Sequence, residues 1–260
     1  MDHEVHDHDR GLSFDLTSLM ERRQTLKLLA GVGVVALVGC GSDKKTAIGS
    51  DAACSTIPSE TAGPFPGDGS NGPDILTESG VVRRDIRSSF GSAGGVAAGV
   101  PLTIKLNVVD RGSGCSARSG AAVYVWHCDI DGKYSLYSQG VTDENYLRGV
   151  QATGSDGAVT FTSIVPGAYS GRWPHIHFEV YPSLTEATSS GNAVATSQLA
   201  LPSDACDLVY ATDGYGQSAR NFAQSSLDRD NVFSDGYASQ LARVTGSVSS
   251  GFVAQLSVPV

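Results

Sequence analysis

The sequence predicts an all-β protein, an antiparallel β-sandwich with irregular arms and little helix. Three observations predict this fold class: the apolar segments are short, turn-forming Gly, Asp and Ser separate them, and no long segment has helical periodicity. Short strands joined in this way are typical of two packed sheets. With 260 residues and 40% hydrophobic content, the chain is long enough for one such domain behind an exported leader.

The expected strands follow in chain order. Residues 100–109 alternate apolar and polar side chains and predict the clearest strand. The other expected strands are 81–86, 121–130, 158–164, 175–181, 193–201 and 251–258. Asp-Gly pairs predict the turns before residues 134 and 158, and 206–229 is expected to be a loop with a short helical turn. Together these elements predict one domain over residues 59–260.

The first 39 residues have the features of an export signal. The apolar run over 28–38 is too short to span a bilayer and has the length of a signal-peptide core. The preceding RRQTLK resembles a twin-arginine export signal, and LVGC, ending at Cys40, resembles a bacterial lipobox. These features predict an exported periplasmic or cell-surface lipoprotein, attached to a membrane only through lipid on Cys40, with a flexible tether over 40–58. The alternative, a buried N-terminal helix, is disfavoured by the small residues that follow.

Charge and cysteine content argue against nucleic-acid binding and against a cysteine metal site. A net charge of −9 gives no basic footprint for nucleic acid. Beyond Cys40, the remaining cysteines are Cys54, Cys115, Cys128 and Cys206. An even number in an oxidising compartment predicts two disulfides, with the pairing left open. A thiolate metal site is disfavoured because no pair has Cys-x-x-Cys spacing.

The segment GRWPHIHFEV, residues 171–180, carries the strongest functional signal. Its alternation from His175 onward predicts a strand with one polar and one apolar face, so that His175 and His177 point the same way. Two imidazoles at this spacing can reach one metal ion, although an isolated pair is more often two ordinary polar residues. Here Arg172 and Tyr169 precede them closely, and the only other histidine after the leader is His127.

A second segment, VYVWHCDIDGKY at 123–134, strengthens this interpretation. Together with PGAY at 166–169 and RWPHIH at 172–177, it resembles the intradiol ring-cleavage dioxygenases, the family of protocatechuate 3,4-dioxygenase and catechol 1,2-dioxygenase. The resemblance covers residues 59–180 well and implies the β-sandwich core of that family. Each motif alone is weak, whereas the set is specific.

The resemblance implies one non-haem Fe(III) per chain, held by Tyr134, Tyr169, His175 and His177. Ferric iron is a hard Lewis acid that keeps phenolates ionised, whereas a site of two histidines and one carboxylate would favour Fe(II). The implied reaction cleaves a catechol-type ring between its hydroxylated carbons with O2 and gives a cis,cis-muconate-type diacid. Tyr169 is then also a base toward the substrate, and Arg172 stabilises negative charge that develops on it.

Other interpretations of these residues stay open. Tyr134 can be an ordinary turn residue, Tyr169 a loop cap, and Arg172 the partner of a surface carboxylate at Glu179 or Asp129. From the resemblance, His127 is a candidate for the border of the substrate pocket and not a metal ligand, whereas Trp126 suits a core position or a pocket wall under every interpretation.

Two further functions compete with the enzyme. One is a non-catalytic exported β-sandwich that binds iron or a catecholate, and the other is a purely structural domain. The loop between Tyr169 and His175 is shorter than in protocatechuate dioxygenases, and no helical N-terminal segment of the catechol-dioxygenase type is present. These departures leave the particular catechol and the oligomeric state open.

Overall fold

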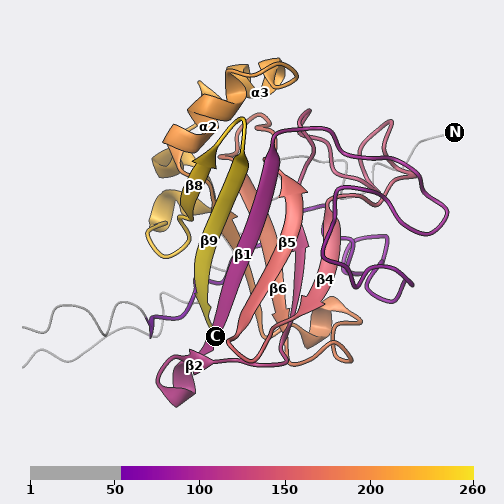
Figure 1. Cartoon of the computed structure of the whole chain (residues 1–260), viewed down its shortest axis with the longest axis vertical. Coiled ribbons are helices and arrows are strands. Elements are labelled where there is room, and N and C mark those ends of the chain that lie inside the picture. Colours follow the sequence, from indigo (N-terminus) through magenta and orange to yellow (C-terminus); the bar gives the residue numbers. More distant parts are fainter. Residues whose placement is uncertain (1–53) are drawn as a thin grey trace, which may run out of the picture. The chain divides into compact units, whose positions relative to one another are not determined.

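Two β-sheets pack face to face in the computed structural model, which describes residues 54–260 (Figure 1). The first sheet has the order β2-β1-β9-β8, and β5 pairs with β1. Its strands are β1 (Pro101–Asp110), β2 (Ser116–Ala117), β5 (Ala158–Ile164), β8 (Arg243–Ser247) and β9 (Gly251–Pro259). The second sheet has the order β4-β3-β6-β7. Its strands are β3 (Ala122–Trp126), β4 (Arg148–Ala152), β6 (His175–Tyr181) and β7 (Ala195–Ala200). The expected β-sandwich is confirmed.

One strand pair departs from the antiparallel arrangement. β1 and β9 run parallel, with Leu102 beside Phe252 and Val109 beside Pro259. Parallel neighbours require a long connection between them, and here almost the whole domain lies between the two strands. The sequence pattern of each strand carries no information on the direction of its neighbour.

The expected and observed strands agree best where apolar and polar residues alternate clearly. The expected strands 158–164 and 175–181 match β5 and β6, and 251–258 matches β9 closely. The expected strand 81–86 forms only isolated bridges at Val82 and Asp85. The sequence does not predict the short strands β2, β4 and β8. β2 has only two residues, and the Gly and Arg residues of β4 and β8 interrupt alternation, so pairing with a neighbour defines all three.

Helices occur where the sequence predicts a loop with a short helical turn. The α-helices are α2 (Ser203–Tyr210) and α3 (Gly216–Phe222). The 3-10 turns are η4 (Arg111–Ser113), η5 (Ser190–Asn192), η6 (Leu227–Arg229) and η7 (Phe233–Asp235). α2 packs on the main core through Cys206, Val209 and Tyr210, at the end of the sandwich near β8 and β9 (Figure 1).

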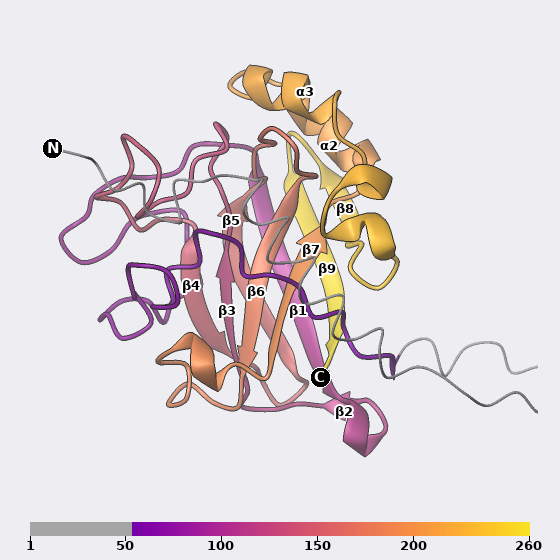
Figure 2. The same cartoon turned by 180° about the vertical axis from the view of Figure 1, so that it is seen from behind.

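β6 separates the main core from a second buried layer. Ile176, Phe178 and Val180 face the first sheet and belong to the main core. The alternate residues, which include His175 and His177, lie on the opposite face and are also buried. The first part of an N-terminal arm, residues 56–90, crosses this outer face (Figure 2). The predicted polar face is therefore covered by protein.

Hydrogen bonds hold the arm against the second sheet. The backbone N–H of Glu60 donates to Thr196 O at 2.9 Å, and Gln198 Nε2 donates to Thr61 O at 2.9 Å. Arg148, 1% exposed, donates to the backbone oxygens of Pro66 and Phe65 at 2.7 and 2.9 Å. Its guanidinium also donates to Ser135 O and Oγ, so one buried cation joins the arm to the loop between β3 and β4.

The cysteines differ from the expectation of two disulfides among four residues. Cys54 and Cys115 are disulfide-bonded. Cys128 and Cys206 are free thiols, and both are buried. Cys128 Sγ donates to Gly167 O at 3.4 Å, whereas Cys206 belongs to α2 and packs into the main core. The number of cysteines in the sequence does not show which of them meet in space.

The expected export signal 1–39, the lipidation site Cys40 and most of the expected tether lie outside the described residues. The folded unit extends from Thr56 to Val260. Ile57 is already buried and donates its N–H to Pro259 O, so the unit begins before residue 59. Within residues 54–260, no helix has the length and apolarity needed to cross a membrane.

Two loops meet closely beside β6, and a glycine makes the approach feasible. Gly167 N–H donates to Asp129 O at 3.0 Å, and a Cβ at Gly167 would lie 2.7 Å from that oxygen and 2.6 Å from Ile130 O. Ser218 on α3 bridges the same loops, donating to Ile130 O and accepting from Ala168 N–H. The position of Tyr169 therefore depends on this contact.

Gly167→Ala is expected to destabilise the protein by about 1–3 kcal/mol, because two backbone oxygens would have to move away from the new methyl group. Urea unfolding measures the change. Gly94→Ala is the matched control, since a Cβ at Gly94 meets no atom within 4 Å. Equal stability of the two variants would show that the loops separate at little cost.

Candidate metal centre

Four side chains from three segments meet on the outer face of β6. His175 and His177 are alternate residues of this strand and therefore point the same way. Tyr169 comes from the loop between β5 and β6, and Tyr134 from the loop between β3 and β4. These are the four ligands that the sequence predicts, and the structure brings all of them together.

The Nε2 atom of His175 lies at the middle of the cluster. Tyr134 Oη is 3.4 Å from it, Tyr169 Oη 3.2 Å and His177 Nε2 3.1 Å. The two phenol oxygens are 3.4 Å apart. All four potential donor atoms thus converge on one small volume, although their residues are spread over some forty positions of the chain.

Neighbouring groups orient both imidazoles. His175 Nδ1–H donates to Trp173 O at 2.5 Å, which leaves the lone pair of Nε2 directed at the cluster. The His177 ring stacks on the Trp126 indole at a centroid distance of 4.9 Å and an interplanar angle of 6°. Gly63 of the arm closes the other side, since a Cβ there would lie 3.3 Å from His177 Cε1.

The donor distances fit a bound metal ion. Two ligands that bind one metal ion at about 2.0–2.1 Å and at a tetrahedral angle are separated by about 3.3–3.4 Å. The four separations given above are 3.1–3.4 Å. Two phenol oxygens are hard donors that match ferric iron, and imidazole suits iron as well. Elsewhere in residues 54–260, no group of three His, Cys, Asp or Glu side chains is arranged to hold a metal.

Burial keeps these four groups neutral in the absence of a cation. Desolvation raises the pKa of Tyr134 well above its ordinary value and that of Tyr169 to about 12. Desolvation also lowers the pKa of His175 and His177 well below the ordinary value. Neutral imidazoles are ready to bind a metal, whereas the phenols would ionise only when a strong Lewis acid binds.

Arg172 lies against the cluster and is buried. Its Nη1 donates to His175 Nε2 at 3.4 Å, and its Nη2 donates to Gln198 Oε1 at 2.6 Å. Its Nε donates to Asp230 Oδ2 at 3.0 Å. The carboxylate that pairs with Arg172 is therefore Asp230, not Glu179 or Asp129. Gln198 and Asp230 were not predicted from the sequence, because no local motif marks partners 26 and 58 residues away.

Trp126 and His127 occupy different environments. Trp126 is fully buried and forms the wall behind His177, with Tyr124 stacked on its other side at 4.9 Å. His127 is 1% exposed, and its Nδ1 and Nε2 bond to Cys128 O at 2.8 Å and Ser163 Oγ at 2.7 Å. His127 thus has a buried position with partners in two segments, and its place at the border of a substrate pocket stays a prediction.

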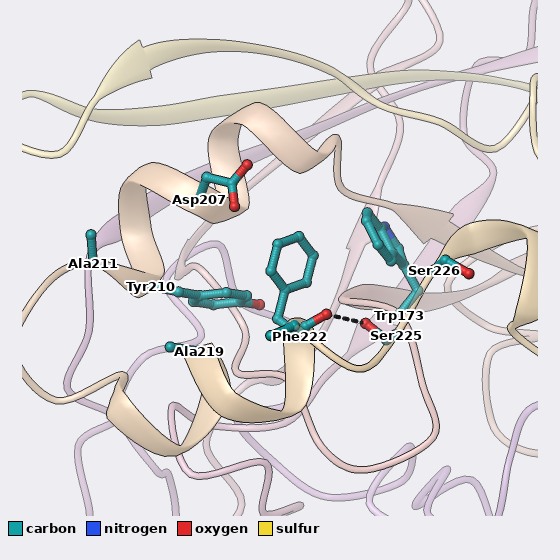
Figure 3. Close-up of a pocket in the computed structure, with 9 residues that line it drawn as sticks. Trp173, Asp207, Tyr210, Ala211, Ala219, Phe222, Ser225 and Ser226 are labelled. Carbon is teal, nitrogen blue, oxygen red and sulfur yellow. Dashed lines mark hydrogen bonds between the residues drawn. The ribbon is translucent and has the colours of Figure 1, made fainter.

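An open groove lies against Trp173, two residues before His175 (Figure 3). It has a volume of about 580 Å³ and lies between α2 and α3. Its aromatic lining is Trp173, Tyr210 and Phe222, and Asp207, Ser225 and Ser226 add polar atoms. None of the four potential metal ligands lines this groove.

Comparisons with known proteins agree with the geometry. The Dioxygenase family model matches residues 72–176, which include Tyr134, Tyr169, Arg172 and His175. A chlorocatechol 1,2-dioxygenase of Rhodococcus opacus is 30% identical over 115 residues, or 35% of this chain, and the match spans 42% of that relative's length. Both matches cover less than half of the chain, and over that part it is similar to dioxygenases, among them a chlorocatechol 1,2-dioxygenase.

A solved structure shares the fold over most of the chain. An intradiol ring-cleavage dioxygenase from Tetranychus urticae superposes with a TM-score of 0.63 and is 24% identical. The superposition covers 80% of this chain and 96% of that one. At this identity the similarity establishes the fold alone, so the reaction has to be inferred from the residues of the site.

Arg172→Gln is expected to cost about 3–5 kcal/mol of stability, because it leaves the buried Asp230 carboxylate without its cation. Arg87→Gln is the control, since Arg87 forms its ion pair with Asp85 at the surface, where the side chains are 41% and 50% exposed. The control should lose less than about 1 kcal/mol. Urea unfolding at neutral pH compares them, and equal losses would argue against a charged, buried pair.

His127 is expected to make stability fall in acid. Desolvation lowers its pKa in the folded protein from 6.5 to about 4. Between these values the unfolded chain binds a proton that the folded chain does not, so stability decreases as pH falls through this window and is unaffected above it. The loss is on the order of 3 kcal/mol. Unfolding at pH about 7 and about 4.5 should show a shallower dependence for His127→Gln; an unchanged dependence would contradict the assignment.

Proposed function

We propose that this chain is a non-haem Fe(III) intradiol dioxygenase. It cleaves a catechol-type ring between its two hydroxylated carbons with O2 and gives a cis,cis-muconate-type diacid. The observation that carries the proposal is the convergence of Tyr134, Tyr169 and His177 on His175 Nε2, at 3.1–3.4 Å. The match to the Dioxygenase family model and the similarity to a chlorocatechol 1,2-dioxygenase support the same reaction class.

The four converging residues would hold the iron. Two phenolate oxygens favour the ferric over the ferrous state, because their negative charges offset the higher charge of Fe(III). Bound Fe(III) would supply a Lewis acid that draws electron density from a catecholate and opens its ring to attack by O2. The hydrogen bond from His175 Nδ1–H to Trp173 O keeps Nε2 available as a ligand.

The protein groups around the iron have separate roles in this proposal. Tyr169 lies on a loop and is less buried than Tyr134, so its Oη is suited to accept a proton from an arriving substrate hydroxyl. Arg172 Nη1, directed at the cluster, would stabilise negative charge that develops on the substrate. Burial of His175, His177 and Tyr134 to 2–3% exposure keeps water from competing with these interactions.

We also propose that the enzyme works outside the cytoplasm. The twin-arginine-like signal, the apolar run over 28–38 and the lipobox ending at Cys40 support export and attachment through lipid. Mass spectrometry of protein extracted from bacterial membranes would test this. Acylated Cys40 at the mature N-terminus is the expected result, and an intact leader would contradict it.

The decisive experiment combines metal analysis, a visible spectrum with and without catechol, and O2 uptake. One iron per chain, a tyrosinate-to-iron charge-transfer colour and consumption of O2 with catechol are expected. A colour that catechol shifts without O2 uptake would favour a non-catalytic iron- or catecholate-binding protein. Colourless, metal-free protein from iron-replete cells would favour a structural domain.

Tyr134→Phe is expected to remove the colour and lower kcat/KM for catechol by at least about 100-fold, because it removes an anionic ligand and keeps the ring in place. Tyr237→Phe is the control, since Tyr237 packs in a separate cluster with Trp173 and Phe233. Iron content, spectrum and O2 uptake are measured for both. Full activity in Tyr134→Phe would refute the ligand assignment.

A further inference from the structure

Asp230 lies beneath the candidate centre and is 2% exposed. Its two carboxylate oxygens have separate partners. Oδ1 accepts the backbone N–H groups of Val232 at 2.8 Å and Phe233 at 3.2 Å. Oδ2 accepts Arg172 Nε at 3.0 Å and the backbone N–H of Trp173 at 2.6 Å. The first pair of bonds sets the orientation of the carboxylate, and the second pair holds two consecutive residues of the segment that precedes β6.

Both groups held by Oδ2 lead to the same residue, His175. Through the first, Arg172 extends its Nη1 to within 3.4 Å of His175 Nε2. Through the second, the Trp173 residue presents its carbonyl oxygen to His175 Nδ1–H at 2.5 Å. One carboxylate oxygen of Asp230 therefore holds both the Arg172 guanidinium beside His175 and Trp173, whose carbonyl oxygen orients the His175 ring.

We propose that Asp230 is a positioning residue of the centre, which aligns the Arg172 guanidinium and the His175 imidazole with the metal and substrate. This inference rests on the proposed function. The carboxylate of Asp230 bonds to Arg172 and Trp173 rather than to a potential ligand, so it acts through these two residues. Gln198 supports the same guanidinium from β7, through a 2.6 Å bond with Nη2.

Burial gives this arrangement its effect. Water cannot replace Asp230, because Arg172 and Trp173 are only 6% and 7% exposed. An asparagine has one acceptor oxygen, so it cannot satisfy the turn at 232–233 and the Arg172–Trp173 pair together. Loss of such an outer hydrogen-bond partner typically costs about 10–100-fold in metal affinity or activity.

Asp230→Asn in the full chain tests the proposal, with Asp228→Asn as the matched control because Asp228 is exposed and two residues away. Iron retention is measured by competition with a chelator, and the charge-transfer band is recorded with and without catechol. We expect Asp230→Asn to release iron about 10–100-fold more readily, to shift the band and to lower kcat/KM. The control should match the parent protein.

A double-mutant cycle separates positioning from a purely structural role. If Asp230 acts partly through Arg172, the kcat/KM loss in Arg172→Gln with Asp230→Asn is smaller than the combined losses of the single variants. Independent losses, or iron retention and spectra unchanged in Asp230→Asn, would overturn the proposal. If the parent protein holds no iron, the proposed function fails instead, so the two failures are distinguishable.

Folding is checked by circular dichroism, because a buried carboxylate can also matter for stability. If Asp230→Asn does not fold, Asp230→Glu replaces it, since it keeps the charge and displaces the carboxylate by one methylene. Positioning predicts that this variant also loses iron and shifts the band, whereas simple charge compensation predicts parent-like behaviour. Failure of both variants to fold would overturn the proposal in favour of a structural carboxylate.

Discussion

The site depends on the burial of β6 on both faces and on its pairing along both edges. β3 and β7 flank the strand, with Trp126 opposite His177 on one side and Gln198 opposite His177 on the other. A period of two then divides its side chains between two environments. Ile176, Phe178 and Val180 enter the main core, so a slip of one residue would bury both imidazoles there. Burial of the apolar residues on one face thus fixes which side chains lie on the opposite face, where the candidate metal centre is.

The outer face carries polar groups that ordinary burial would disfavour. Desolvation raises the pKa of Glu179 to about 7, and the Tyr181 hydroxyl donates to its carboxyl at 2.6 Å. Arg148 is buried nearby and satisfies its guanidinium with backbone and hydroxyl oxygens of the arm and a loop. Buried polar groups are stable only with such partners. The arm therefore creates the low-dielectric layer in which imidazole and phenol groups can serve as ligands.

Loops supply the groups that have to converge from a distance. Tyr134 and Tyr169 come from two loops that touch through Gly167 and Gly132, where a Cβ would lie 2.9 Å from Tyr169 Cβ. Gly132 has a φ of +78°, a conformation that glycine adopts without strain. Rigid strands thus hold the imidazoles, while closely packed turns place the phenols against them. The less buried of the phenols, Tyr169, is the one suited to meet a substrate.

The amino-acid sequence by itself determined the β class, the strands with strong alternation, the shared direction of His175 and His177, and the four side chains that meet. These follow from local periodicity and from motifs whose residue types seldom occur together by chance. Only the tertiary structure decided the parallel pairing of β1 with β9, the free thiols of Cys128 and Cys206, and Asp230 as the partner of Arg172. The strand pairing and the ion pair join distant segments, and the two thiols are free because no distant cysteine reaches them. Packing and desolvation favour these arrangements, and a local pattern of residues contains no information on either.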